Sequence, residues 1–365
     1  MVNHYYQARM RRVHMAKISI VGGGSWGLAI ALMLYKQHHQ VSVWEYNPDH
    51  VQKLVFQRKN DDFLNGIIFP EGIFFTNHLP DLFSHELAIP QNNIYQASVF
   101  PEILVFAVPS SFLRATVRKV KEYLPPRGIK GIVILTKGLE ENSLKRMSEV
   151  LTEELPSFYA DKICTLSGPS HAEEVSRGVP TLVVVAGNNP EILKIVQKTF
   201  SNSVFRVYTS DDLVGVEIGA AVKNIISIAA GVVAGLNFGD NTMGALLTRG
   251  LAEIKRLGLA LNGKSETFSG LSGLGDLVTT SISQHSRNRF VGYQLAQGKT
   301  LDEIVKNMVQ IAEGIITTKN IRELKEKLGI SMPITEEMYQ LLYHSKPPLK
   351  ALLCLMTRDL KNESD

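Results

Sequence analysis

The sequence feature that most constrains the fold is a long segment, residues 213–236, that is apolar along nearly its whole length. Its charged residues are Glu217 and Lys223. A helix that is apolar all round is buried, either in the core of a large protein or in a membrane. An ionised ammonium in either place costs free energy unless it is paired or its pKa falls. Lys223 is therefore either a lysine that reaches outward to solvent or a proton-transfer group in the wall of an active site.

We expect this segment to be a core helix rather than a membrane span. It is long enough to cross a bilayer, but it contains Glu, Lys, Asn and several glycines, and no comparable segment occurs elsewhere in the chain. Its small residues would let neighbouring helices approach closely; they are Gly215, Gly219, Ala220, Ala229 and Gly231.

Length and composition indicate a globular protein of two domains. At 365 residues the chain is longer than a single hydrophobic core usually grows. Its composition, 44% hydrophobic and 20% charged, is ordinary for a globular protein. A net charge of +4 without a clustered basic stripe argues against a nucleic-acid partner but suits a small anionic substrate.

The N-terminal residues and the cysteines bear on the compartment. Residues 1–14 are basic and polar and lack the apolar segment of a secretory signal, so we expect a disordered extension. Cys164 and Cys354 lie among apolar residues, and we interpret both as reduced core residues. Reduced cysteines indicate a cytoplasmic protein.

A glycine pattern near the N-terminus predicts a dinucleotide site. Gly22-x-Gly24-x-x-Gly27 lies between a predicted strand, 17–21, and a predicted helix, 28–37. In such a turn Gly22 permits the tight bend, Gly24 lets the backbone approach the pyrophosphate, and Gly27 allows close packing of helix on strand. The helix N-terminus attracts the negative charge.

The end of the next predicted strand, 41–46, bears on the choice of coenzyme. Glu45 is placed to bond the adenosine ribose hydroxyls, and a carboxylate there would repel the extra phosphate of NADP. The sequence does not fix the direction of this side chain, and Tyr46 is an alternative contact for the adenine. The choice between NAD(H) and NADP(H) stays open.

Further along the chain, short apolar runs alternate with helical segments. The predicted strands are 103–108, 131–135, 163–166, 182–185 and 205–207. This pattern predicts an α/β fold with a doubly wound, mostly parallel sheet. After Thr209 helical periodicity dominates. We predict a dinucleotide-binding domain at 15–207 and an all-helical substrate domain at 208–365, with residues 83–100 an irregular excursion of no assigned function.

Candidate site residues lie after predicted strands and in the second domain. Ligands gather at the carboxyl ends of strands in such sheets, and those ends are followed by Ser25, Lys137 and Ser170. In the second domain the glycine-dense segment 269–277 holds one acid, Asp276. Beyond it Arg287 offers a planar fork suited to a phosphate, although a surface arginine in a polar loop is the alternative.

Two other patterns carry no function. Residues 258–265 match the P-loop expression, but they follow a helical pattern instead of a strand, and we expect Gly263 to cap a helix. Neither cysteine has the histidine spacing of a zinc site, and we predict no metal site.

Together these motifs resemble one family, the bacterial biosynthetic type of NAD(P)-dependent glycerol-3-phosphate dehydrogenase. The resemblance covers about residues 15–345, and its motifs are VGGGSWG, TKG (136–138), SGPSHAEEV (167–175), GVEIGAAVKNIISIAAG (215–231), LSGLGDLVTT (271–280), SRNR (286–289), AEG (312–314) and MPITEEMYQLLY (332–343). It implies a Rossmann-like domain followed by an all-α domain, NAD(H) or NADP(H) as coenzyme, and a homodimer. The implied reaction interconverts dihydroxyacetone phosphate and sn-glycerol 3-phosphate, which supplies glycerophospholipid synthesis.

The resemblance also implies roles for individual residues. The catalytic group matches Lys223, Lys137 and Asp276. The substrate positions match Lys137, Gly168, Ser170, Lys223, Asp276, Thr280, Ser286, Arg287 and Asn288. The coenzyme positions match Gly22, Gly24, Ser25, Trp26, Gly27, Glu45, Tyr46, Lys137, Ala172, Arg287, Ile311 and Glu313.

The implied chemistry agrees with the physical argument about Lys223. Hydride arriving at a ketone carbon leaves an alkoxide that needs a proton, and a desolvated lysine near a second cation is tuned toward neutral pH. Which of Lys223 and Lys137 donates first stays open, because neighbouring groups titrate as a pair. Two rivals remain: a dehydrogenase of 3-hydroxy acids, and a module that binds NAD(H) without turnover.

Overall fold

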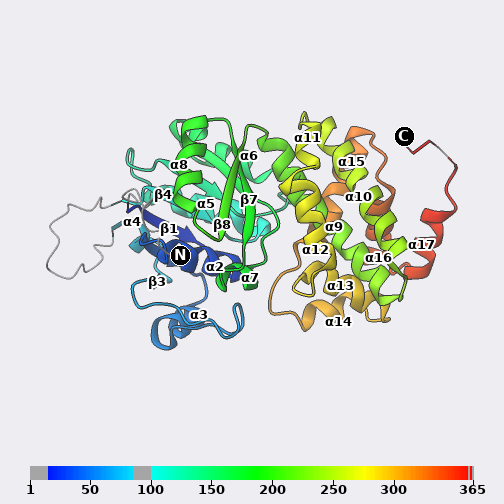
Figure 1. The fold of residues 1–365 in the computed structure, drawn as a ribbon, viewed down its shortest axis with the longest axis horizontal. Helices are drawn as coiled ribbons and strands as arrows, with labels where there is room; N and C mark the ends of the chain where they lie inside the picture. The colour runs from blue at the N-terminus through cyan, green and yellow to red at the C-terminus, as the bar shows by residue number, and fades with distance from the viewer. Residues whose placement is uncertain (1–14, 85–99, 361, 364–365) are drawn as a thin grey trace, which may run out of the picture.

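The computed structural model describes residues 15–84, 100–360 and 362–363. Within these residues the chain forms two lobes, one built on a sheet and one built of helices (Figure 1). The predicted extension at 1–14 lies outside the described residues, as does nearly all of the predicted excursion at 83–100.

The first lobe contains a single eight-stranded sheet with the order β3-β2-β1-β4-β5-β6-β7-β8. Only β6 and β7 pair antiparallel; the other neighbours are parallel. The strands are Lys17–Val21 (β1), Gln40–Trp44 (β2), Phe74–Thr76 (β3), Ile103–Phe106 (β4), Gly131–Ile134 (β5), Ile163–Ser167 (β6), Thr181–Gly187 (β7) and Phe205–Ser210 (β8). The predicted mostly parallel sheet is confirmed, and the strand order reverses between β1 and β4, where ligands bind in such sheets.

Helices cover both faces of the sheet, so the sheet is doubly wound as predicted (Figure 1). One buried cluster contains side chains of α2, α7 and α8, and another contains side chains of α5 and α6. The helices of this lobe are Ser25–Tyr35 (α2), Pro48–Gln52 (α3), Asp81–Ser84 (α4), Ser110–Val120 (α5), Met147–Glu154 (α6), Ala172–Ser176 (α7) and Pro190–Phe200 (α8).

The second lobe is organised around α9 (Leu213–Gly235), which is buried along nearly its whole length. This helix is long and apolar enough to cross a membrane, but 94% of its most apolar part is buried inside the protein. The predicted core helix is thus observed. The helices around it are Asp240–Ala260 (α10), Ser265–Phe268 (α11), Asp276–Ile282 (α12), Arg287–Ala296 (α13), Leu301–Lys306 (α14), Glu313–Leu328 (α15), Pro333–Tyr343 (α16) and Pro348–Met356 (α17).

Small residues let other elements approach α9 as closely as predicted. A Cβ added at Gly219 would lie 2.7 Å from the carbonyl oxygen of Ser272. One added at Gly231 would lie 2.0 Å from the carbonyl oxygen of Arg289 on α13. The backbones therefore touch directly at these positions, where any side chain would force the helices apart.

Several details differ from expectation, and one strand, β3 at Phe74–Thr76, was not predicted. Cys354 is exposed on α17, so it is not a core residue, whereas Cys164 is buried in β6. At the end of α10 the left-handed residue is Asn262, with φ 66°, and not the predicted cap Gly263. Strand β8 extends to Ser210, beyond its predicted end at residue 207. The P-loop match itself lies at a helix C-terminus, as predicted.

The contact between α9 and α13 predicts that Gly231→Ala is destabilising. Because the added methyl would meet backbone, we expect a loss of about 1–3 kcal/mol in the free energy of unfolding. Gly244→Ala on α10 is the control, since a Cβ there meets nothing within 4 Å; that change should stabilise the helix by about 0.5–1 kcal/mol. Equal denaturation midpoints for the two variants would contradict the packing argument.

Candidate active site

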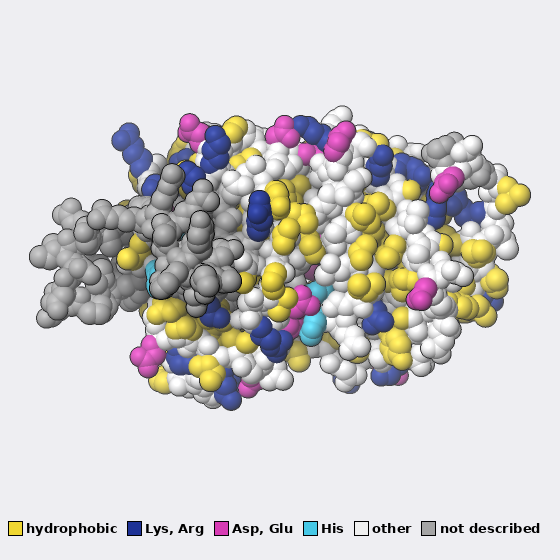
Figure 2. Space-filling model, viewed as in Figure 1, with side chains coloured by type: hydrophobic (Ala, Val, Ile, Leu, Met, Phe, Trp, Pro, Cys, Tyr) yellow, Lys and Arg dark blue, Asp and Glu magenta, His cyan; other side chains and the backbone are white. Residues whose placement is uncertain are grey.

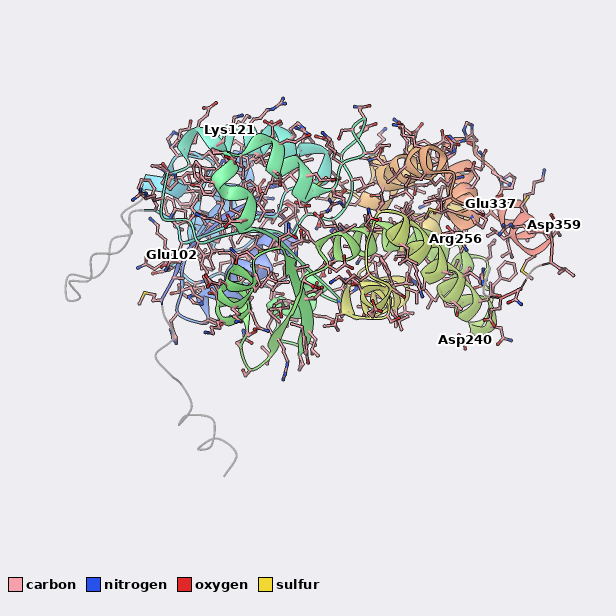
Figure 3. All side chains as sticks on the ribbon, turned by 90° about the horizontal axis from the view of Figure 1, so that it is seen from above. Glu102, Lys121, Asp240, Arg256, Glu337 and Asp359 are labelled. Carbon is pink, nitrogen blue, oxygen red and sulfur yellow. The ribbon has the colours of Figure 1, made fainter. Side chains whose placement is uncertain are left out.

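Two lysines and an aspartate from three parts of the chain meet where the two lobes join. Lys137 lies in the loop that follows β5, Lys223 lies on α9, and Asp276 begins α12. Other charged side chains, such as the labelled Lys121, Asp240 and Asp359, project from the outer surface instead (Figure 3). On the face shown in Figure 2, acidic and histidine side chains gather at the same junction of the lobes.

Asp276 binds both lysines. Its Oδ1 lies 2.5 Å from Nζ of Lys223, and its Oδ2 lies 2.8 Å from Nζ of Lys137. Lys223 also donates to Oγ1 of Thr280, 2.6 Å away. The Lys223 and Asp276 side chains are 6% and 2% exposed, and Lys137 is 18% exposed. With both lysines protonated the cluster carries one excess positive charge, which suits an anionic ligand.

Burial decides the titration of this cluster. It lowers the pKa of Lys223 to about 7; repulsion from Lys137 adds to the effect, and attraction to Asp276 opposes it. Burial alone would raise the pKa of Asp276, but the two lysines hold that pKa below its ordinary value. The site therefore contains an ionised carboxylate and an amine that exchanges its proton near neutral pH.

A glycine-dense turn, Leu271–Gly275, brings Asp276 onto α9. This turn is a short π-helix directly before α12. A Cβ at Gly273 would lie 2.1 Å from the carbonyl oxygen of Phe268, so the turn has no room for a larger residue there. This tight turn and the close approach of the backbones at Gly219 explain why Asp276 reaches Lys223, which is distant in sequence.

The loop after β6 lies beside the cluster. Gly168 has φ +144°, and a Cβ there would lie 3.0 Å from Cα of Val183, so the position requires glycine. Its carbonyl oxygen accepts from Oγ of Ser170 at 2.9 Å and from Nζ of Lys137 at 3.5 Å. Both predicted residues of this loop are therefore next to the cluster.

Of the three polar residues predicted for the phosphate, one is exposed. Arg287 is exposed and donates to the carbonyl oxygen of Ile311 at 2.9 Å. Ser286 is buried and caps α13, while Asn288 joins α9 to α15 by bonds to Oδ1 of Asn224 and to the amide of Gly314, both 2.9 Å long. Ser286 and Asn288 thus hold the helix that carries Arg287.

The glycine turn has the shape that a dinucleotide needs. Gly22 has φ +120°, and a Cβ there would lie 2.6 Å from the carbonyl oxygen of Ala107. A Cβ at Gly27 would lie 1.9 Å from the carbonyl oxygen of Gly22. At Gly24 a Cβ would meet nothing within 4 Å, so this glycine borders open space at the start of α2. The indole Nε1 of Trp26 is buried there without a hydrogen-bond partner.

Glu45 is directed toward the glycine turn, which settles the direction that the sequence left open. Its Oε2 accepts from the amide of Gly23 at 3.0 Å, and its Oε1 accepts from the amide of Asn47 at 3.1 Å. Tyr46 is 77% exposed.

A segment of the second domain reaches the glycine turn. Gln310 accepts from Oγ of Ser25 at 2.9 Å, and Glu313 accepts from Oγ of Ser110 at 2.6 Å. These two bonds bring the segment with Ile311 and Glu313 to the dinucleotide-binding domain. Ala172, another predicted coenzyme position, is buried at the start of α7 and packs against α2. Gln310 was missed in the sequence, because a lone glutamine in a loop gives no signal.

No group of three or more His, Cys, Asp and Glu side chains in the described part of the chain could hold a metal ion. The polar groups that the structure brings together at the site are the two amines, the carboxylate and the hydroxyl of Thr280.

Comparison with known proteins identifies the family. The models for the N-terminus and C-terminus of NAD-dependent glycerol-3-phosphate dehydrogenase match residues 17–193 and 212–353. The glycerol-3-phosphate dehydrogenase, NAD(P)+, of Chlorobium phaeobacteroides is 45% identical over 95% of this chain and 99% of its own length. The enzyme of the same name from Fusobacterium nucleatum is 42% identical over 96% of this chain and 99% of its own length.

A solved structure agrees. The crystal structure of glycerol-3-phosphate dehydrogenase from Coxiella burnetii superposes with a TM-score of 0.86 at 34% identity, and the match covers 94% of this chain and 99% of that chain. The chain therefore belongs to the NAD-dependent glycerol-3-phosphate dehydrogenase family and is an oxidoreductase that uses NAD(P)(H).

Proposed function

We propose that this enzyme interconverts dihydroxyacetone phosphate and sn-glycerol 3-phosphate. The observation that carries the proposal is the buried cluster of Lys223, Asp276 and Lys137, in which Lys137 follows β5 at the same carboxyl edge of the sheet as the glycine turn after β1. The names of the relatives support glycerol 3-phosphate as one member of this pair. A sensor that binds NAD(H) without turnover has no need of a buried amine with a pKa of about 7.

The proposed coenzyme contacts agree with the shape of the glycine turn. Gly24 leaves room for the pyrophosphate at the N-terminus of α2, and Trp26 offers an unpartnered indole donor. Ser25 belongs to the same turn and bonds Gln310, the neighbour of Ile311 in the chain, while Glu313 bonds Ser110 at the start of α5. When bound, the nicotinamide supplies or accepts the hydride. The Glu45 carboxylate next to Gly23 disfavours a further phosphate on the ribose, so we expect NADH to be preferred over NADPH.

The proposed role of the cluster is proton transfer at the ketone oxygen. Reduction of the ketone leaves an alkoxide, and Lys223 donates the proton that converts it into an alcohol. Lys137 stabilises the developing negative charge, and Asp276 holds both amines in place. In the reverse direction the neutral amine of Lys223 takes the proton of the alcohol.

The proposed substrate contacts surround this cluster. Gly168, Ser170 and Thr280 lie beside the two amines, and Arg287 offers its guanidinium to the phosphate. Ser286 and Asn288 act by fixing the first turn of α13, which carries Arg287. The phosphate is remote from the reacting carbon, so its binding energy serves to orient the ketone.

Three wider proposals follow from the family resemblance. The product supplies the glycerol 3-phosphate of glycerophospholipids, the enzyme is a homodimer, and it is located in the cytoplasm. The two cysteines support a reducing compartment, since both are free in the structure.

Assay of NADH and NADPH oxidation with dihydroxyacetone phosphate, and with a 3-keto acid in its place, tests the activity. We expect NADH oxidation with the phosphorylated ketone.

In Lys223→Met, kcat should fall about 10²–10⁴-fold, because the proton donor is lost, while NADH binding by fluorescence should persist. Turnover of the keto acid alone, or a near wild-type kcat in the variant, would rule out the proposal.

A second test concerns the glycine turn. Gly24 has extended backbone with φ −72°, which alanine adopts freely, so Gly24→Ala should fold normally. We expect its methyl group to occupy the space of the pyrophosphate and to weaken NADH binding at least about tenfold, or 1.4 kcal/mol. Gly27→Ala should instead lower the melting temperature, because its methyl group meets backbone. Unchanged NADH affinity in Gly24→Ala would place the coenzyme elsewhere.

A further inference from the structure

The one other charged residue of α9, Glu217, is buried and unused by the proposed chemistry. Its side chain reaches across to the dinucleotide domain, where it accepts from Nη1 of Arg146 at 2.8 Å. It also accepts from the amide and the hydroxyl of Ser148, at 2.9 and 2.6 Å, and from Oγ1 of Thr165 at 3.3 Å. These partners lie at the N-terminus of α6 and in β6.

Arg146 is the last residue of the loop that carries Lys137. This segment, residues 137–146 and here named the Lys137 loop, connects β5 to α6. The loop is held from three sides, because Asn320 of α15 donates to the carbonyl oxygen of Leu139 at 3.0 Å, and Nε of Arg114 on α5 bonds Oε1 of Glu140 at 2.6 Å. Of these anchors, Glu217 alone lies on the helix that carries Lys223.

Because Glu217 and Lys223 lie on the same rigid helix, the contacts of Glu217 also determine where Lys223 lies. Glu217 and Lys223 are separated by a rise of about 9 Å along one helix, at 1.5 Å per residue. Fixing Glu217 to the end of the Lys137 loop and to β6 therefore fixes Lys223 relative to Lys137. Asp276 can bond both amines at once only when their separation is maintained.

We propose that Glu217 is a positioning residue for the reaction, which locks α9 to the Lys137 loop and so sets the distance between the two lysines. The inference rests on the proposed function of those lysines. An anchor of this kind acts on kcat, because misplacement of catalytic groups by even 1 Å costs about a hundredfold in rate. Binding of the coenzyme depends on the glycine turn and is independent of the anchor.

Glu253 supplies a matched control. It is also buried, at 2% exposure against 4% for Glu217, and it also holds a helix N-terminus. Its carboxylate accepts from the amides of Ile334 and Thr335 at 2.5 and 3.1 Å and from the hydroxyl of Thr335 at 3.0 Å, all at the start of α16. None of these partners belongs to the Lys137 loop, to β6 or to the lysine cluster.

The test compares Glu217→Gln with Glu253→Gln by melting temperature, NADH affinity and the kcat of dihydroxyacetone phosphate reduction. Both changes should lower the melting temperature, because each replaces a buried acceptor oxygen by an amide NH2 donor that faces other donors. We expect kcat to fall about ten- to hundredfold in Glu217→Gln alone, with NADH affinity unchanged in both. Equal kcat values in the two variants, measured on folded protein, would reduce Glu217 to a purely structural role and overturn the inference.

A double variant separates positioning from general damage. In a Lys137→Met background the loop has already lost the amine that Glu217 positions, so adding Glu217→Gln should cause little further loss of kcat. If the fold decrease of kcat in the double variant equals the product of the decreases in the two single variants, Glu217 does not act through Lys137. Absence of activity in the wild type would instead refute the proposed function, and the two failures are therefore distinguishable.

Discussion

The desolvation of one ammonium group underlies the rest of this structure. Lys223 is buried on a helix that is apolar on nearly every side, and a charge in such a place is tolerated only with a partner. Asp276 is that partner, and it is shared with Lys137. Burial outweighs this attraction and brings the pKa of Lys223 to about 7. Removing Asp276 would leave the buried ammonium of Lys223 without its counter-charge, so the cluster constrains both domains at once.

The backbone around α9 makes this arrangement possible. Glycines at positions 219 and 273 let the turn before α12 lie directly on the helix, which brings a carboxylate within bonding distance of the amine. The glycines at 231 and 292 do the same for α13, whose first turn carries Arg287. Small residues therefore serve the site as much as the fold, because they determine how near the polar groups approach.

The sequence predicted those features that follow from local pattern and sterics. Continuous apolar runs identified seven of the eight strands that the structure describes, with β3 missed. The need for backbone contact at Gly22 and Gly27 appeared in the structure as predicted. Burial of the helix followed from its composition, whereas the sequence left open whether Lys223 reaches solvent; the structure buries it. The union of Lys137, Lys223 and Asp276 did not follow from spacing, because the three lie far apart in sequence; it was expected through the family resemblance alone, and their roles stay predictions.

Other features lay beyond local pattern. A continuous apolar strand looks the same in either direction, so the antiparallel pairing of β6 and β7 had no signal. Cys354 sits among apolar residues that are themselves exposed, such as Leu353 and Met356, and its neighbours therefore misled the prediction. Gln310 and Glu217 act through long-range contacts between the domains, which a single chain without its fold does not reveal.

The pH dependence of kcat/KM in both directions of the reaction tests the central claim most directly, because it reports groups that titrate before substrate binds. With a Lys223 pKa of about 7, reduction needs the protonated amine and should fall about tenfold per pH unit above that value. Oxidation needs the neutral amine and should rise to a plateau above the same pH. Reduction that stays constant to pH 9, with no break near 7, would contradict the account.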